Sequence, residues 1–396
     1  MSQSNKHKIA IFSPNMGGGG GGGAQRVMGI IASGLADDGY DVDLVLAQKS
    51  GPYLDEIGEK VRVVDLGAKR LLWSVPKLRS YLKREQPMVL MSTIGFMNVG
   101  AVVAAKLSGC GCRLILREAN TSASMSVFAR GPGSLFHRAA DLFRPFFYRR
   151  ADGLVAVARQ LEDDLVENVG QERAKIRTIY NPTLTPDFWE KSQASPDDAS
   201  LIPEEGELIL AVGRLWEQKD YPTLLEAFRR LRKSRPTANL LILGEGPDRR
   251  KLEKQIEAMG LNGAVKMPGF VSNPFPYMRK ADLFVLSSKF EGLPNSLIQA
   301  LACGCQIVST DCPSGPREVL DGGTYGCLVP VGEVRRLAEG MEDVLERRPF
   351  SVPGAWVEKF ESDFAIAQYE RFLIMGTPLE KCSDQGASPG APDLSN

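Results

Sequence analysis

Three groups of residues in this 396-residue sequence combine types and spacings suited to binding a phosphorylated ligand. The first is a run of seven glycines, Gly17 to Gly23, between a short apolar run and the residues AQRV. Glycine lets the backbone approach a ligand closely, and the start of a helix presents N–H groups that attract anions. The run predicts an anion cradle, although it has neither G-x-G-x-x-G spacing nor the Lys-Ser/Thr of a P-loop. A flexible loop is the alternative interpretation.

The second group is AVGRLWEQKD, in which Gly213 is expected to end a strand and Arg214 and Lys219 to lie on the following loop. A forked guanidinium and an ammonium at the carboxyl end of a strand could clamp a diphosphate. The alternative is two solvated charges, because Lys and Arg are common on surfaces.

The third group lies between Ser287 and Val319. Glu291 and Gly292 come just before residues 293–295, which begin an expected helix, so a fixed turn directs the Glu291 carboxylate and the first backbone N–H groups into a cleft. Gln299 follows Glu291 by about two helical turns and lies near the same face. A surface carboxylate and a solvated amide are the alternative.

The sequence argues against two common hydrolytic mechanisms. It contains only two histidines, His7 and His137, whereas a triad needs a His base and most metal hydrolases need several His ligands. Seven cysteines are present, but the pairs 110/112 and 303/305 are too closely spaced for a zinc framework and lack nearby histidines. We therefore expect reduced, packed thiols, no metal site and no bound cofactor.

Short apolar runs alternate with helical patterns almost from end to end, which predicts two doubly wound α/β domains with parallel sheets. The expected strands are 8–14, 42–47, 61–66, 88–93, 113–118, 153–157 and 176–180, then 208–212, 240–243, 264–267, 283–286, 306–309 and 326–329. The clearest helical patterns are 24–37, 96–107, 222–233, 248–259, 295–302 and a long one at 357–374. Open sheets of this kind bind ligands at the carboxyl ends of their strands, so the cleft between the domains is the expected active site.

Composition changes along the chain divide it into five parts. Residues 1–187 form the predicted first domain, and 188–206, rich in Pro, Ser and acidic residues, form a linker. Residues 207–355 form the second domain, 356–375 a helix packing back on the body, and 376–396 a disordered tail.

Charge is balanced overall, with 48 basic and 48 acidic side chains, but it is unevenly distributed. Residues 66–150 carry 14 basic against three acidic side chains, a net charge of +11. Two basic amphipathic segments there, 69–85 and 134–150, suit an anionic membrane surface or a lipid-linked diphosphate. Ordinary helices with a basic solvated side are the alternative. Nucleic acid is not an expected partner, since the aromatic residues share core spacing with leucines.

The start of the chain lacks the apolar core of a secretory signal, and no run reaches the roughly 20 apolar residues of a membrane span. We expect a cytoplasmic protein that binds peripherally to the cytoplasmic face of the inner membrane.

From Lys8 to about Leu373 the sequence resembles the retaining GT-B glycosyltransferases of family 4. The motifs that carry this resemblance are GGAQR at 22–26, GRLWEQK at 213–219, GEGP at 244–247, PGFV at 268–271 and EGLPNSLIQA from residue 291. Five motifs in this order are specific together. The resemblance implies two Rossmann-like domains facing across a cleft and transfer of a sugar from a nucleotide diphosphate donor, usually a UDP-sugar, with retention of configuration.

The same resemblance assigns roles to residues. Arg214 and Lys219 would hold the donor diphosphate, Gly22 and Gly23 would approach it from the first domain, and Glu291 would contact the donor sugar. Further donor-binding positions are Gly213, Phe270, Val271, Gly292, Leu293, Pro294, Asn295 and Gln299, with the loop 269–271 framing the base. Front-face departure of the diphosphate needs neither a protein nucleophile nor a metal, so catalysis would rest on positioning and on stabilising the leaving charge.

The sequence departs from the family pattern at three places. Gln299 stands where relatives carry a second glutamate for the ribose hydroxyls, and the loss of charge would weaken donor binding by about 1 to 2 kcal/mol. Glu118 and Asn120 match the acidic residue and the Asn of a SERN-like motif and are expected to bind substrate, but Ala119 replaces the His of some relatives. The glycine run is longer than the usual pair.

The expected function is transfer of an N-acetylhexosamine or a hexose from a UDP-sugar to a saccharide acceptor linked to polyprenyl diphosphate. A UDP-sugar 2-epimerase of the same architecture is one alternative, although it would depend on carboxylates alone for its acid and base. An inactive nucleotide-sugar binding module is the other.

Overall fold

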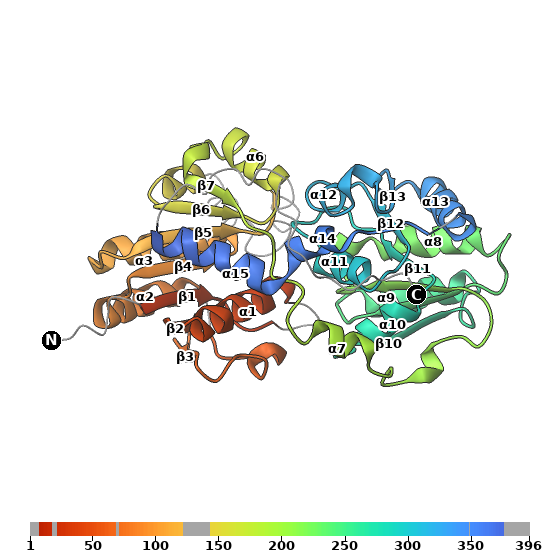
Figure 1. The fold of residues 1–396 in the computed structure, drawn as a ribbon, viewed down its shortest axis with the longest axis horizontal. Coiled ribbons are helices and arrows are strands. Elements are labelled where there is room, and N and C mark those ends of the chain that lie inside the picture. The colour runs from red at the N-terminus through yellow and green to blue at the C-terminus, as the bar shows by residue number, and fades with distance from the viewer. Residues whose placement is uncertain (1–7, 18–21, 69–70, 122–142, 348, 376–396) are drawn as a thin grey trace.

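The computed structural model describes residues 8–17, 22–68, 71–121, 143–347 and 349–375. These residues form two α/β domains, each built on one parallel sheet with helices packed against it (Figure 1). The predicted fold class is confirmed. Every expected strand is present, with ends that differ by at most two residues.

The first sheet has seven strands in the order β3-β2-β1-β4-β5-β6-β7. Along the chain these are β1 (Lys8–Ser13), β2 (Asp41–Leu46), β3 (Arg62–Asp65), β4 (Val89–Thr93), β5 (Arg113–Glu118), β6 (Gly153–Ala156) and β7 (Ile176–Thr178). The helices around it include α1 (Gly23–Asp37), α2 (Leu71–Glu85), α3 (Gly95–Ser108) and α6 (Arg159–Glu167). All residues of β1, β4 and β6 are buried, as in strands covered on both faces.

The second sheet has six strands in the order β10-β9-β8-β11-β12-β13. Along the chain these are β8 (Leu208–Val212), β9 (Asn239–Leu243), β10 (Val265–Gly269), β11 (Leu283–Leu286), β12 (Ile307–Thr310) and β13 (Cys327–Val329). Its helices include α8 (Tyr221–Leu231), α9 (Arg249–Ala258), α10 (Phe275–Lys280), α11 (Asn295–Ala302), α12 (Pro316–Val319) and α13 (Val334–Glu346).

The strand order of each sheet reverses at one point, between β1 and β4 in the first domain and between β8 and β11 in the second. Loops that leave neighbouring strands in opposite directions at such a point open a crevice at the carboxyl ends of the strands. The glycine run follows β1, the Arg214 loop follows β8 and the Glu291 loop follows β11. The fold therefore brings the three sequence groups to the two crevices.

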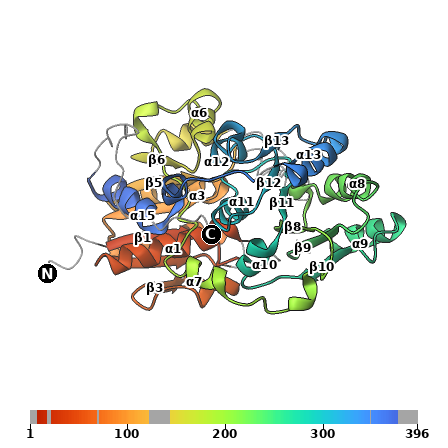
Figure 2. The same cartoon turned by 45° about the vertical axis from the view of Figure 1, so that its right-hand side comes forward.

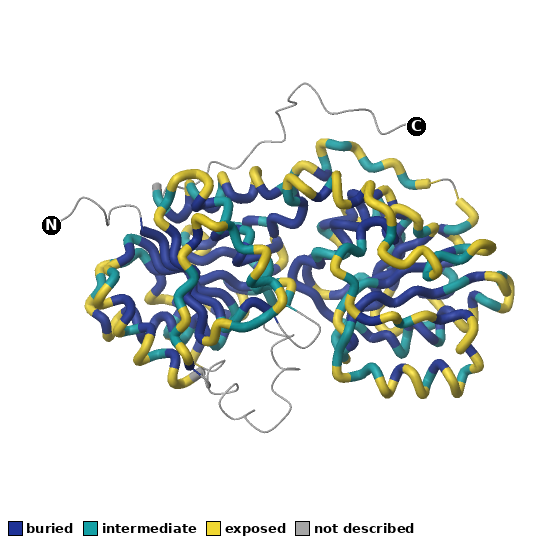
Figure 3. The backbone as a smooth tube through the Cα atoms, turned by 90° about the horizontal axis from the view of Figure 1, so that it is seen from below, coloured by how far each residue is buried: buried dark blue, intermediate teal, exposed yellow. Residues whose placement is uncertain are grey.

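Along the chain between the two domains, the segment expected to be a linker contains α7 (Phe188–Gln193) and a short 3-10 turn (Ala199–Leu201). The segment packs on the second domain, where the Phe188 and Phe275 rings lie 4.7 Å apart. Figure 3 shows the strands of both domains as the most buried part of the chain, surrounded by partly exposed helices.

At its end the chain returns to the first domain, where α15 (Ser362–Glu370) packs on α1 (Figure 2). The expected continuous helix over 357–374 is wrong. It is broken into α14 (Gly354–Val357), a 3-10 turn (Glu358–Phe360), α15 and a π turn (Arg371–Met375). The break occurs because the Thr183 and Leu184 amides donate to the Phe360 carbonyl, which leaves Glu361 extended.

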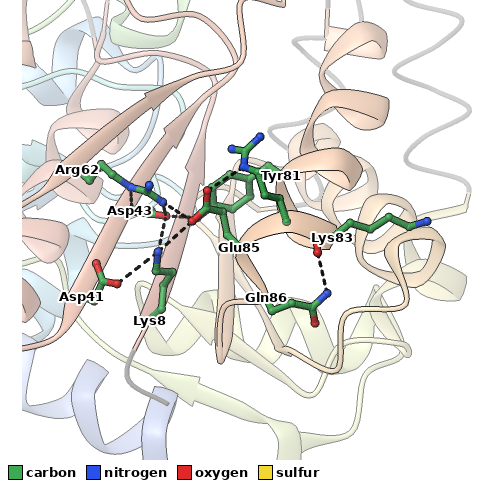
Figure 4. A network of polar contacts seen from close by, with 9 residues as sticks. Lys8, Asp41, Asp43, Arg62, Tyr81, Lys83, Glu85 and Gln86 are labelled. Atoms are coloured by element: carbon green, nitrogen blue, oxygen red, sulfur yellow. Dashed lines mark hydrogen bonds and ion pairs between the residues drawn. The ribbon is translucent and has the colours of Figure 1, made fainter. Parts of the chain in front are cut away.

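A polar network ties the end of α2 to the sheet at the amino ends of β1, β2 and β3 (Figure 4). The fully buried Asp43 carboxylate accepts from Arg62 Nε at 2.7 Å and from the Tyr81 hydroxyl, and Lys8 Nζ lies 3.0 Å from Glu85 Oε2. Asp43 belongs to the one Asp-x-Asp sequence near a strand end, and its contacts are structural.

Candidate active site

A cavity of about 650 Å³ lies between the two domains, at the carboxyl ends of both sheets. The first domain contributes Gly22 and Gly23 after β1, Ile94 after β4, and Ala119 and Asn120 after β5. The second domain contributes the loops after β8, β10 and β11 and the first turns of α11. Both crevices of the fold thus open into one site.

Arg214 and Lys219 both line this cavity, but they differ in exposure and in ion pairing. Arg214 is exposed, its guanidinium lies 5.2 Å from the centre of the Trp216 ring, and it forms no ion pair with a carboxylate in the part of the chain that the structure describes. Lys219 is largely buried, and its Nζ lies 2.6 Å from Glu291 Oε1. Arg214 is therefore the cation that is already available to an anion.

Glu291 is held from several directions. The Ser288 hydroxyl donates to Oε1 at 2.6 Å, and Gln218 Nε2 lies 3.5 Å from Oε2. The neighbouring Gly292 packs against the first domain so closely that a Cβ there would lie 1.8 Å from the Ala119 carbonyl oxygen. Only glycine fits at this contact, which fixes the turn that carries Glu291 into the cavity.

Two further glycines permit close backbone approach at the cavity wall. Gly22 has a φ of 144°, and a Cβ there would lie 2.5 Å from the Gly17 Cα. A Cβ at Gly244 would lie 2.0 Å from the Gly213 carbonyl oxygen, so the loops after β8 and β9 pass each other without side chains between them.

All but one of the residues expected to bind substrate line the cavity: Gly22, Gly23, Asn120, Gly213, Arg214, Lys219, Phe270, Val271, Glu291, Gly292, Leu293, Pro294, Asn295 and Gln299. Gln299 is 8% exposed and Phe270 is 53% exposed. The structure therefore brings together motifs that are up to about 280 residues apart in the sequence.

Glu118 is the exception, because its side chain does not line the cavity. It is 1% exposed and accepts hydrogen bonds from Asn98 Nδ2, at 3.0 Å, and from the Tyr148 hydroxyl. Burial raises the pKa of this carboxyl, although the nearby Arg144 and both hydrogen bonds oppose the shift. The structure therefore does not place Glu118 among the cavity residues with which it was expected to act, since the pleat of β5 turns its side chain to the other face of the sheet.

Several cavity residues were missed by the sequence analysis, notably Arg117, Asn181, Trp216 and the trio Arg26, Tyr53 and Glu56. Arg117 precedes Glu118 in β5 and therefore points to the opposite face. Arg26 Nε lies 2.6 Å from Glu56 Oε2, and the Arg26 guanidinium lies 5.6 Å from the Tyr53 ring centre. One signal in the sequence could have indicated Arg117. Successive side chains of a strand point to opposite faces, so only one of Arg117 and Glu118 can point toward the cavity.

Two facing parallel-sheet domains, with the site between the carboxyl ends of their strands, define the GT-B class of fold. The profile of the family described as Glycosyltransferase Family 4 matches residues 21–183, and that described as Glycosyl transferases group 1 matches residues 193–359. Together they account for both domains, and the chain belongs to these glycosyltransferases.

Individual proteins agree with this assignment. The N-acetylgalactosamine-N,N'-diacetylbacillosaminyl-diphospho-undecaprenol 4-alpha-N-acetylgalactosaminyltransferase of Campylobacter jejuni is 32% identical over 63% of this chain and 66% of its own length. The chain spans about half to two thirds of the length of the first curated relatives it matches.

Solved structures share the fold. Sucrose-phosphate synthase from Thermosynechococcus elongatus superposes with a TM-score of 0.73 at 17% identity, covering 94% of this chain and 100% of that one. Anabaena HepE, solved in complex with UDP, superposes with a TM-score of 0.69 at 17% identity, covering 92% and 99%.

Proposed function

We propose that the protein is a retaining glycosyltransferase that moves a hexose or N-acetylhexosamine from a UDP-sugar to a lipid-linked saccharide. The observation that carries the proposal is the pairing of two surfaces across the cavity. On one side lies the Gly22-Gly23 turn at the start of α1, and on the other lie Arg214 and Lys219. A diphosphate between them would meet a helix start and two cations.

The charged side chains would act on the leaving group. As the sugar–oxygen bond breaks, negative charge develops on the diphosphate, and the Arg214 and Lys219 charges would stabilise it. In a front-face transfer the acceptor hydroxyl bonds to the anomeric carbon on the side that the diphosphate leaves, and its proton passes to a diphosphate oxygen. The protein then supplies position and charge, with no protein nucleophile and no metal ion.

Two observations support a lipid-linked acceptor. The curated Campylobacter relative is named for an undecaprenol diphosphate acceptor, and the first domain carries an exposed apolar group on α2. On α2, Leu78 and Leu82 are fully buried and pack inward. The first turn nevertheless exposes Leu72 and Trp73, each more than 60% accessible, in a region of net positive charge. An apolar tip beside basic residues suits an anionic lipid surface. None of the described helices is long and apolar enough to span a membrane.

The direct test is incubation of the purified protein with UDP-sugars, with and without polyprenyl-diphosphate-linked saccharides. Sugar transfer with the anomeric configuration retained supports the proposal. Isomerisation of the UDP-sugar without acceptor would indicate the epimerase, and binding without turnover would indicate the inactive module. Transfer should also survive EDTA, and loss of activity that Mn²⁺ restores would contradict the metal-independent mechanism.

A further inference from the structure

A line of polar side chains crosses from the first domain to the second at the cavity. It begins at Arg117, which lies at the end of β5, is fully buried and lines the cavity. Arg117 Nε donates to the Tyr369 hydroxyl at 3.0 Å, Nη1 donates to Thr93 Oγ1 at 3.2 Å, and Nη2 donates to Asn181 Oδ1. These partners are neutral, and no carboxylate among the described residues forms an ion pair with Arg117. No described carboxylate therefore neutralises its positive charge beside the cavity.

Arg117 sets the direction of the hydrogen bonds along this line of side chains. A guanidinium has only donors, so the Asn181 amide must turn its oxygen toward Arg117 and its NH₂ group away. Asn181 Nδ2 accordingly donates to Asn295 Oδ1 at 2.7 Å, across the domain boundary. The Thr183 hydroxyl lies 3.3 Å from the same Asn295 oxygen and 3.2 Å from the Asn181 carbonyl oxygen, and its one proton is shared between these two acceptors.

The Asn181 NH₂ group thus occupies the oxygen of Asn295 and leaves the Asn295 NH₂ group on the other side. Asn295 lines the cavity, and its Nδ2 lies 3.5 Å from the position that a Cβ on Gly23 would take. No hydrogen bond joins Asn295 Nδ2 to an acceptor in the described ranges. The Asn295 NH₂ group beside the Gly22-Gly23 turn is therefore available to donate to a ligand in the cavity, and the ligand expected there is anionic.

We propose that Arg117 and Asn181 are positioning residues that hold the Asn295 amide with its NH₂ group toward the cavity, where it donates to a phosphate oxygen of the donor nucleotide. The inference rests on the proposed function, because the phosphate is that of the UDP-sugar. Arg117 acts through Asn181 and through its positive charge, and of these three residues Asn295 is the one that donates to the phosphate. An amide turned the other way would present its oxygen to the phosphate and repel it.

The first variant is Asn295→Asp, which keeps an oxygen to accept from Asn181 and Thr183 but replaces the NH₂ group by a negative oxygen. We expect UDP to bind at least tenfold more weakly in calorimetry, uridine to bind as before, and the melting temperature to change little. The matched control is Asn239→Asp, at the far end of β9 from the cavity, where Nδ2 donates to the Thr237 carbonyl. UDP affinity within twofold of wild type in Asn295→Asp would overturn the proposal.

The second variant is Asn181→Asp, which keeps an acceptor for Arg117 but has no donor for Asn295. The Asn295 amide should then turn to give its NH₂ group to Asp, which places its oxygen in the cavity. We expect UDP to bind about fivefold to tenfold more weakly through the turned Asn295 amide, with stability maintained by the new Arg117 ion pair. Unchanged UDP affinity would overturn the relay, as would an equal loss of uridine affinity.

Arg214→Ala separates this inference from the function on which it rests. If Arg214→Ala weakens UDP binding and Asn295→Asp does not, the relay is wrong and the proposed donor site stands. If the wild-type protein does not bind UDP, both are wrong.

Discussion

Lys219 Nζ and Glu291 Oε1 lie 2.6 Å apart, so two charged groups expected to meet the donor at separate places meet each other. The side chains of Lys219 and Glu291 are only 15% and 8% exposed, respectively, which keeps solvent from screening their attraction. Glu291 therefore does two things at once: it lines the cavity, and it pairs with the cation that we propose for the donor diphosphate.

This pairing predicts opposite effects on binding and turnover in Glu291→Gln. Removing the carboxylate leaves the Lys219 charge unpaired, and an incoming diphosphate would relieve it, so UDP should bind about fivefold more tightly, or about 1 kcal/mol. Transfer should nevertheless slow, because the contact between Glu291 and the sugar is lost. Calorimetry with UDP and steady-state kinetics measure the two effects. Weaker UDP binding in a folded variant would show that Lys219 does not serve the diphosphate.

Arg214 makes the simpler prediction, since no carboxylate of the described residues competes for it. Arg214→Ala should raise the donor KM and lower kcat, with about 2 to 3 kcal/mol of transition-state stabilisation lost. Arg335→Ala, which removes an exposed cation from α13, is the matched control and should leave the kinetics unchanged. Normal donor kinetics in Arg214→Ala would exclude it from the clamp.

The sheets could be predicted because a strand covered on both faces is a continuous apolar run, and central strands such as β1, β4 and β6 have that signature. The location of the site followed from motifs placed after β1, β8 and β11. The contacts within it could not be predicted, since the Lys219–Glu291 ion pair joins residues 72 positions apart whose distance no pattern encodes.

The clearest difference between the expected and the observed cavity lining lies on one strand, β5. Arg117 and Glu118 are neighbours in β5, so they must point to opposite faces, but the sequence does not say which face meets the cavity. Side chains from the elements that cover the two faces of the sheet decide it. Tyr369 hydrogen-bonds Arg117 on one face, while Asn98 and Tyr148 enclose Glu118 on the other.

The network at the end of α2 predicts a loss of stability in acid. Burial alone would raise the pKa of Glu85, but hydrogen bonds from Arg62, Lys8 and Arg84 lower it to about 2. A lowered carboxyl pKa contributes stability above the ordinary value of 4.5, and that contribution is lost as the pH falls toward 2. Because solvent reaches part of the Glu85 side chain, we expect its charge to contribute about 1 to 2 kcal/mol to the free energy of unfolding at neutral pH.

Urea unfolding of wild type and Glu85→Gln between pH 7 and pH 2 measures this contribution. The two proteins should differ at neutral pH and converge in acid, whereas Glu257→Gln, at an exposed position on α9, should follow wild type throughout. A constant difference between Glu85→Gln and wild type at every pH would show that the charge of Glu85 is not responsible.

The apolar tip of α2 predicts binding to vesicles that contain anionic lipid. Replacing Leu72 and Trp73 by Ser should weaken that binding several-fold, and added salt should weaken it for wild type because exposed charges are screened within about 8 to 10 Å. Leu107→Ser removes an equally exposed leucine at the other end of the helix layer and is the control. Equal binding to neutral and anionic vesicles, or binding to neither, would leave α2 as an ordinary packed helix.

The last prediction concerns Gln299, and the Lys219–Glu291 ion pair decides whether Gln299→Glu strengthens or weakens UDP binding. Residue 299 is 8% exposed and lines the same cavity wall as Glu291. If it faces the ribose, Gln299→Glu offers an acceptor to two hydroxyl groups, and UDP should bind more tightly by about 1 kcal/mol, or roughly fivefold.

A second carboxylate would ordinarily repel Glu291 and raise the pKa of one of the two carboxyl groups. Because Lys219 already pairs with Glu291, we expect this repulsion to be small and UDP binding to become tighter. Turnover should change less than affinity, since contacts made alike in ground and transition states alter KM. Calorimetry with UDP at neutral pH separates the outcomes. Tighter binding supports the ribose contact, weaker binding means that the two carboxylates crowd each other, and unchanged binding means that residue 299 does not touch the donor.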